Sequence, residues 1–125
     1  MNGRGFIGRK GEDDACLYLN SLGHSIIERN WRSAHCEIDI ISADNSGLHF
    51  VEVKTRTSAA TADPEVNVGP AKRKNLERAA RRYLAAGKGR AFAERGAQFD
   101  VLTIVYDHNE THINYYTQAF IPIYD

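Results

Sequence analysis

The sequence contains few cysteines: only Cys16 and Cys36 occur among its 125 residues. Two cysteines at this spacing form neither a disulfide framework nor a CxxC metal motif. Small secreted domains that cannot bury a large core commonly depend on several disulfides, whereas this composition agrees with a reducing compartment. We therefore expect a cytoplasmic protein.

The chain also lacks long hydrophobic runs. Its uninterrupted apolar stretches are only a few residues long, whereas a membrane-spanning helix needs ~20 apolar residues. The N-terminal sequence MNGRGFIGRK has no apolar core of the kind that signal peptides carry. The sequence therefore predicts neither a membrane segment nor a secretion signal.

The length and composition predict one globular domain over residues 1–125. The apolar fraction is 42% and the charged fraction 26%, as in an ordinary globular protein rather than a disordered one. Domains contain roughly 100–200 residues, so the chain has no room for a second core.

Neither sign of charge is in excess, because 16 basic residues balance 16 acidic ones. Taken alone, this balance argues against a polyanionic partner. However, residues 71–95 contain nine cations and two anions, a local charge of +7 that leaves −7 elsewhere. Lys72 and Arg73 stand in the first turn of a predicted helix, where cations oppose the helix dipole. A nearby negative partner would offset this cost, and it is either a nucleic-acid phosphate or an acidic cluster of the protein.

Hydrophobic periodicity and turn residues predict an α/β protein. The first helix should end at Gly23 in a left-handed cap, and Pro70 suits the first turn of the second helix. A strand–helix–strand order favours a right-handed crossover, and so a mixed sheet with helices packed against it. In chain order, the expected elements are a helix (11–22), three strands (24–31, 37–42 and 48–55), a helix (70–87) and two strands (99–106 and 113–120).

A predicted β-hairpin brings two acidic residues together. Residues 37–42 and 48–55 are rich in β-branched side chains, and the turn-forming sequence ADNSG separates them. If residues 44–47 form a four-residue loop, the numbers of facing residues sum to 91, and Asp39 faces Glu52. Like charges at facing positions destabilise a sheet unless something lies between them, and a divalent cation is the obvious candidate.

Two further residues accompany this pair. Lys54 shares a strand face with Glu52, because alternate residues of a strand point the same way. Glu12 lies on the apolar stripe of the first helix, where a buried carboxylate needs a partner. Alone, Lys54 would suggest a surface salt bridge and Glu12 a helix-dipole interaction; together with the hairpin acids, they favour a functional site.

These residues suit Mg²⁺ or Mn²⁺, which prefer oxygen ligands and retain several waters. Asp39, Glu52 and the backbone carbonyl of Val53 would supply the protein ligands. In phosphodiester hydrolysis such a metal polarises a phosphate oxygen and lowers the pKa of its bound water. Lys54 could orient that water or neutralise charge that develops in the transition state.

Five segments of the chain carry a family resemblance: GEDDACLYLNSLG, CEIDII, FVEVKTR, AKRKNLERAARRYL and QFDVLTI. Together they resemble the YraN-like family of small bacterial proteins over most of the chain, from about Gly8 to Val105. That family is grouped with archaeal Holliday junction resolvases and the PD-(D/E)XK superfamily. The resemblance implies a restriction-endonuclease-like fold, with a mixed central β-sheet flanked by helices.

The resemblance also implies roles for individual residues. Asp39 and Glu52 match the metal-binding acids, Lys54 the catalytic lysine, and Glu12 the acid of the first helix. Asp100 lies in the Phe-Asp-Val motif, where a structural role is favoured.

The chain departs from the family pattern at a few positions. Cys36, preceded by His35, replaces the usual glycine before Glu-Ile-Asp, and Gln98 replaces a common arginine. These departures leave the acidic residues intact.

The favoured function is a metal-dependent nuclease that acts on DNA, with branched or repair intermediates among the candidate substrates. We expect Arg56, Lys72 and Arg73 to contact the nucleic acid. Resolvases act as dimers, so a homodimer is compatible with the resemblance, although nothing in the sequence requires one. The alternative is an inactive module of the same fold that binds nucleic acid or a protein.

The histidines and the aromatic residues near the C-terminus are weaker candidates for a functional role. Histidine-based catalysis without a metal has little support, because the histidines are scattered and His49 points away from Glu52. Aromatic residues near the C-terminus could stack on bases or form a dimer contact, but packing of the last strand against the core is favoured. These aromatic residues are Tyr115, Tyr116, Phe120 and Tyr124.

Overall fold

The computed structural model describes residues 5–57, 68–85 and 87–120. The predicted order of helices and strands is confirmed, and a short 3₁₀ helix is added before β4. The elements are α1 (Phe6–Ser21), β1 (Ser25–Ser33), β2 (Cys36–Asp44), β3 (Gly47–Thr57), α2 (Pro70–Ala85), η1 (Gly87–Phe92), β4 (Ala97–Asp107) and β5 (Glu110–Phe120).

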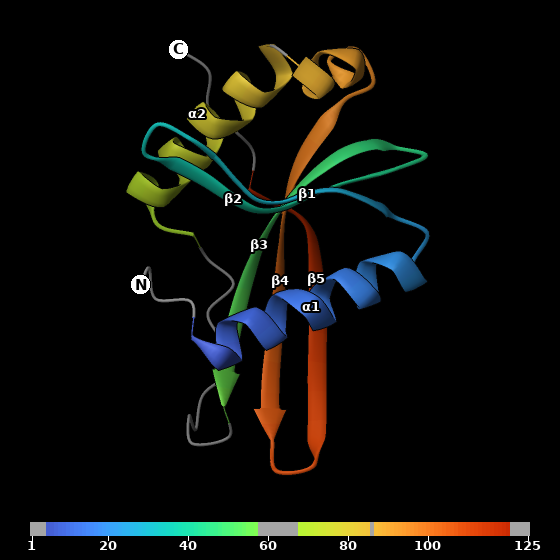
Figure 1. The fold of residues 1–125 in the computed structure, drawn as a ribbon, viewed down its shortest axis with the longest axis vertical. Helices are drawn as coiled ribbons and strands as arrows, with labels where there is room; N and C mark the ends of the chain where they lie inside the picture. The colour runs from blue at the N-terminus through green and yellow to red at the C-terminus, as the bar shows by residue number, and fades with distance from the viewer. Residues whose placement is uncertain (1–4, 58–67, 86, 121–125) are drawn as a thin grey trace.

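The strands form one mixed sheet in the order β1-β2-β3-β4-β5 (Figure 1). Neighbouring strands run antiparallel except β3 and β4, which are parallel. Parallel neighbours require a crossover connection, and α2 lies in the segment that joins β3 to β4. The mixed sheet predicted from the strand–helix–strand order is therefore confirmed.

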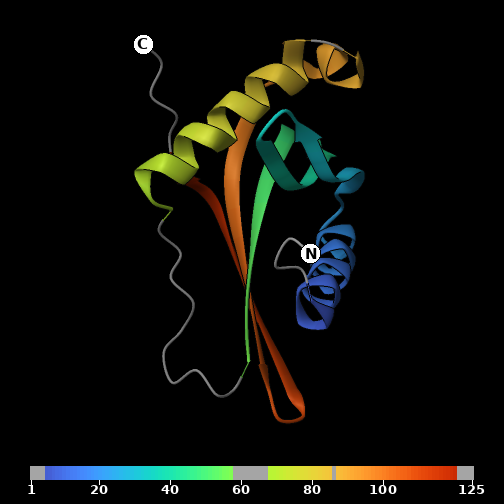
Figure 2. The same ribbon diagram turned by 60° about the vertical axis from the view of Figure 1, so that its left-hand side comes forward.

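The two α-helices cover opposite faces of the sheet (Figure 2). On one face, Ala15 and Leu19 of α1 belong to a buried cluster with Val51 and Leu102. A second cluster fills the other face, between α2 and the sheet; it contains Leu76, Ala80 and Tyr83 of α2 with Phe50 and Phe99 of the sheet. This arrangement is the predicted α/β fold, a sheet between two helical layers.

The boundaries of α1 differ from the prediction at one end. The helix begins at Phe6 instead of Gly11. The prediction missed these first residues because side chains such as Phe6 and Ile7 are exposed and add nothing to the apolar stripe. Its other end is as predicted: Gly23 has a φ of +96°, and the His24 N–H bonds to the Leu19 carbonyl at 3.0 Å.

The β2–β3 hairpin has the predicted register but a shorter loop. Ile40 pairs with Val51 and Asp44 pairs with Gly47, so only residues 45 and 46 remain outside the ladder. The predicted four-residue loop is therefore wrong. The turn is tightened by Ser46, whose backbone N–H donates to Asp44 Oδ1 at 2.9 Å.

The last strand packs against the core, as favoured from the sequence. Phe120 is buried and stacks on Phe99, with 4.8 Å between ring centroids. Tyr115 is partly buried against the α1 face, whereas Tyr116 is exposed. Tyr124 lies outside the described residues. Both cysteines are buried and form no disulfide.

Candidate functional site

Asp39 and Glu52 lie where β2 and β3 stop pairing. The ladder between these strands reaches Ile40 and Val51, and the same register continued by one residue sets Asp39 beside Glu52. Beyond this point a side chain takes the place of the backbone acceptor, because Asp39 Oδ2 accepts a hydrogen bond from the Val53 N–H at 2.9 Å. The hairpin therefore brings together the two acids that the sequence paired.

The electrostatics of Glu52 reflect this proximity. Burial, followed by the neighbouring Asp39 carboxylate, raises the pKa of Glu52 to about 7, although the Lys72 ammonium opposes the rise. Lys72 Nζ lies 3.4 Å from Glu52 Oε2, and the Glu52 side chain is only 13% exposed. Of the two partners predicted for Lys72, the structure therefore shows the acidic cluster.

A cavity of ≈ 650 Å³ opens beside these acids. Residues from four elements line it, including Glu12 of α1, Asp39 of β2, Val53 of β3 and Lys72 of α2. Glu12 is buried, as its place on the apolar stripe predicted. The first helix and the hairpin therefore bring Glu12 and Asp39 to one cavity, whereas Glu52 is not among the described residues that line it.

Close packing of α1 on β3 holds Glu12 at this position. Gly11 lies directly against Thr55, so that a Cβ atom at residue 11 would collide with Thr55 Oγ1. Glycine therefore permits the approach of the helix that carries Glu12 in the next position.

Glu37 also lines the cavity, and sequence reasoning did not select it. It precedes Asp39 by two residues on β2, and its carboxylate forms an ion pair with Arg32 at 3.0 Å. The signal was available, because residues two apart on a strand share a face.

Three other residues were predicted for the site, and the structure gives each of them different contacts. Lys54 is partly buried on β3 and pairs in register with Thr103; it is not among the described residues that line the cavity. The Arg56 side chain is exposed and donates to the Thr55 carbonyl at 3.3 Å. Arg73 lies over the Phe120 ring, 5.0 Å from its centroid. The roles of Lys54, Arg56 and Arg73 therefore stay predictions.

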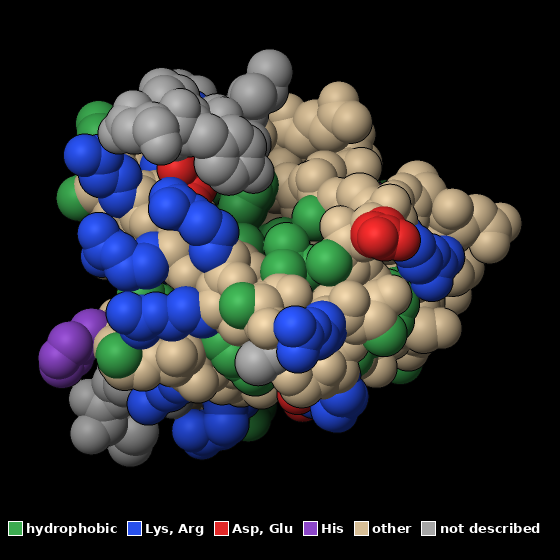
Figure 3. All heavy atoms as spheres, turned by 90° about the horizontal axis from the view of Figure 1, so that it is seen from above, with side chains coloured by type: hydrophobic (Ala, Val, Ile, Leu, Met, Phe, Trp, Pro, Cys, Tyr) green, Lys and Arg blue, Asp and Glu red, His purple; other side chains and the backbone are tan. Residues whose placement is uncertain are grey.

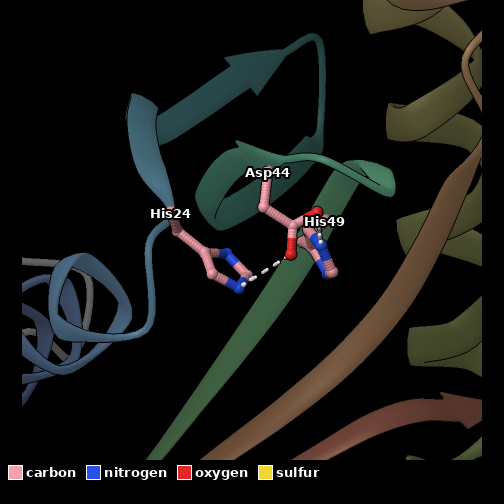
Figure 4. A group of neighbouring side chains, drawn as sticks. All are labelled: His24, Asp44 and His49. Carbon is pink, nitrogen blue, oxygen red and sulfur yellow. Dashed lines mark hydrogen bonds and ion pairs between the residues drawn. The ribbon is translucent and has the colours of Figure 1, made fainter.

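A second polar cluster, which the sequence did not reveal, lies near the other end of α1. The Asp44 carboxylate faces the Nε2 atoms of His24 and His49 (Figure 4), whose ring centroids are 4.4 Å apart. This carboxylate is 3.5 Å from His24 Nε2 and 2.9 Å from His49 Nε2. One ligand atom from each residue lies within 4.8 Å of the others, so the three residues could hold a metal ion. The fold therefore brings together histidines that are scattered along the sequence.

Asp100 supports this cluster from β4. Its Oδ2 contacts His49 Nδ1 at 2.7 Å and accepts a short hydrogen bond from the Tyr115 hydroxyl. Its Oδ1 accepts hydrogen bonds from the Gln98 amide and the Gln118 N–H, both at 2.9 Å. The structural role favoured for Asp100 agrees with these contacts, and Gln98 supplies one of the donors.

Burial and hydrogen bonding have opposing effects on the pKa values in this cluster. Burial lowers the pKa of His24, with a further contribution from His49. Burial also lowers the pKa of His49, but hydrogen bonds to Asp100 and Asp44 outweigh it and leave that pKa raised. Conversely, burial raises the pKa of Asp100, and the bonds it accepts leave it lowered. Asp44 likewise has a lowered pKa, because hydrogen bonds from Ser46 and His49 outweigh its burial.

The mixed sheet between two helices, with paired acids where two strands diverge, defines a protein of the restriction-endonuclease-like class. The sequence matches the model of "Uncharacterised protein family UPF0102" over residues 11–104. The chain therefore belongs to UPF0102, which is the YraN family.

Individual relatives bear the same family name. The UPF0102 protein of Bacteroides thetaiotaomicron is 35% identical over 116 residues, which are 93% of this chain and 93% of that protein. The UPF0102 protein of Geotalea daltonii is 40% identical over 115 residues, or 91% of this chain and 88% of that protein. That of Oleidesulfovibrio alaskensis is 41% identical over 97 residues, which are 78% of this chain but only 46% of the relative. The chain therefore spans less than half the length of this last protein.

A similar solved structure is that of Pyrococcus furiosus SfsA in complex with Ca²⁺. The similarity has a TM-score of 0.37 and 19% sequence identity, and it covers 83% of this chain and 58% of that one. Within residues 5–57, 68–85 and 87–120, no helix has both the length and the apolar character needed to cross a membrane.

Proposed function

We propose that this protein is a metal-dependent nuclease that hydrolyses phosphodiester bonds in DNA. The observation that carries the proposal is that the fold holds Asp39 and Glu52 close together beside a cavity. Burial and the neighbouring Asp39 carboxylate raise the pKa of Glu52 to about 7. Two carboxylates held together in this way favour either a shared proton or a bound cation. Membership of the restriction-endonuclease-like superfamily supports the second reading.

The donor set suits Mg²⁺ or Mn²⁺. Asp39, Glu52 and the Val53 carbonyl would supply hard oxygen ligands, and the cavity leaves room for the waters that these ions retain. When bound, such an ion polarises a phosphate oxygen and lowers the pKa of its water.

The remaining residues would act on the nucleophile and the substrate. The Lys54 ammonium would orient the attacking water or neutralise charge on the phosphate. Glu12 would add a buried carboxylate to the same cavity. In this structure the Lys72 ammonium neutralises Glu52. If a bound metal ion neutralises Glu52 instead, the half-exposed Lys72 ammonium can contact a substrate phosphate.

A basic surface near the cavity favours a polyanionic substrate. Lys and Arg side chains gather on the side of the molecule that carries α2 and η1 (Figure 3). The exposed cations of these elements are Lys72, Lys74, Arg78, Arg81, Arg82, Lys88 and Arg90. Nucleic-acid phosphates are the ligands that such a surface recognises most generally.

Cleavage assays test the catalytic residues. We expect the protein to cleave supercoiled, branched or single-stranded DNA with Mg²⁺ or Mn²⁺, and Asp39→Asn and Lys54→Ala to lower the rate at least a hundredfold while DNA binding stays nearly unchanged. Asp107→Asn is the matched control, because Asp107 is 44% exposed at the end of β4. This variant should cleave DNA at the wild-type rate. If the wild type cleaves none of these DNAs, the enzyme proposal fails for them.

A second candidate is an inactive binding module of the same fold. The specific observation in its favour is the ion pair between Lys72 and Glu52, because it compensates the acidic pair without a metal. Calorimetry discriminates between the two: the nuclease proposal predicts Mn²⁺ binding that Asp39→Asn abolishes. Absence of binding by the wild type would favour the module.

A further inference from the structure

The polar cluster near the end of α1 is separate from the acidic cavity. His49 and Val53 lie on the same face of β3, four residues apart, so ~13 Å of strand separates the two places. His24 lies in the short connection between α1 and β1, Asp44 ends β2, and His49 lies on β3. A site here does not depend on the proposed nuclease function.

We infer that His24, Asp44 and His49 form a binding site for a divalent transition-metal ion of the Zn²⁺ type. Atoms that bind one tetrahedral Zn²⁺ at about 2.0–2.2 Å lie about 3.3–3.6 Å apart. The three ligand atoms lie within 4.8 Å of one another, and the Asp44 carboxylate faces the Nε2 atoms of both rings (Figure 4). Side-chain rotations that shorten these separations by at most about 1.5 Å bring the three atoms within reach of one ion.

The ring nitrogens that point away from Asp44 have hydrogen-bonding partners, as the second nitrogen of a metal-binding histidine commonly does. His24 Nδ1 lies 2.8 Å from Ser42 Oγ, and His49 Nδ1 lies 2.7 Å from Asp100 Oδ2. Both rings therefore present Nε2 to Asp44. A carboxylate behind a histidine fixes its tautomer and orientation, an arrangement that recurs around protein-bound metals.

The surroundings also fit a bound ion. His24 and His49 are buried, while the Asp44 side chain is 28% exposed, so that a water can reach an open fourth position. The groups that face the cluster include the carboxylate of Asp100 and the phenol of Tyr115, and the Arg95 guanidinium donates to the Asp44 carbonyl. Two imidazoles and a carboxylate favour Zn²⁺, Co²⁺ or Ni²⁺ over Mg²⁺.

Calorimetric titration of the purified full-length protein with ZnCl₂ tests this site after removal of metal by EDTA and dialysis. We expect one Zn²⁺ per chain at this site, with His24→Gln and Asp44→Asn each weakening it at least tenfold. Asp39→Asn leaves this binding unchanged, which separates it from the proposed nuclease site. His112→Gln is the matched control, because His112 is exposed on β5 and should bind like the wild type.

Absence of Zn²⁺ binding by the folded wild type overturns the inference, as does equal affinity in the His24→Gln and Asp44→Asn variants. Should either variant fail to fold by circular dichroism, X-ray absorption of the Zn²⁺-loaded wild type decides. Two imidazole ligands per zinc support the site, and a shell of oxygen ligands alone rejects it. In that case the cluster is a hydrogen-bonded network that stabilises the junction of α1, β1 and the hairpin.

Discussion

Glu52 combines burial with a like-charged neighbour, and both make its ionised form costly. In the unfolded chain its carboxyl titrates near 4.5, whereas in the folded protein its pKa is about 7. Between these two pKa values the folded state holds the proton that the unfolded state has lost. Raising the pH through this window therefore destabilises the metal-free protein.

The Glu52→Gln substitution should remove this pH dependence. In EDTA, we expect the variant to gain about 3 kcal/mol of unfolding free energy over the wild type between pH 4.5 and pH 8, because it has no charge to bury. Urea denaturation of both proteins at the two pH values measures the difference. An equal difference at both pH values would show that Glu52 does not titrate in this window.

Single residues also show where sequence reasoning reached its limit. Asp39 and Glu52 could be paired in advance, because one hairpin register relates them. His24, His49 and Asp100 lie far apart along the chain, and the pairing of β3 with β4 and the position of the α1 end bring them together. Their proximity depends on tertiary contacts that no local spacing encodes.

The α1 helix controls the position of Glu12 through a contact with β3. Gly11 gives the helix no side chain at the point where Thr55 meets it. A glycine in a helix normally costs about 1 kcal/mol relative to alanine. Here the close approach reverses the usual preference.

Gly11→Ala should therefore destabilise the protein by about 1–3 kcal/mol, the usual cost of overpacking. Chemical denaturation measures this effect. Thr55→Ala should restore much of the loss in the double mutant, because it removes the colliding atom. Thr55→Val is the matched control and should not restore it, since it keeps a branched side chain. Stabilisation by Gly11→Ala alone would contradict the packing argument.

The elements themselves were predicted well where a face is buried. The stripe through Ala15 and Leu19 predicted α1, and the β-branched residues together with the turn sequence predicted the hairpin. The start of α1 was missed, because Phe6 and Ile7 are exposed and leave no periodic signal. The loop length was wrong, because residues 44 and 47 are turn formers that also pair.

The molecule as a whole is neutral but its charge is segregated. The segment of residues 71–95 has a charge of +7 and contains α2 and η1. Lys74 and Arg78 are exposed there, opposite the buried Leu76. Neutrality weakens long-range attraction of a polyanion, so we expect modest DNA affinity that falls steeply with salt.

Replacement of Lys74 and Arg78 by glutamine should weaken DNA binding and lower the slope of log K against log salt by about 2, since each lost phosphate contact removes ~0.9. Fluorescence anisotropy over a range of salt concentrations measures the slope. Lys10→Gln with Arg29→Gln is the control, because it makes the same change in charge at cations paired with Asp14 and Asp13. Equal slopes for both double variants would exclude α2 as the DNA-binding surface.

Anomalous diffraction from a crystal soaked with Mn²⁺ at pH 8 tests the central claim most directly. The account predicts an anomalous peak within coordinating distance of both Asp39 and Glu52, at the edge of the cavity. The absence of a peak there, or a peak confined to His24, Asp44 and His49, would contradict it.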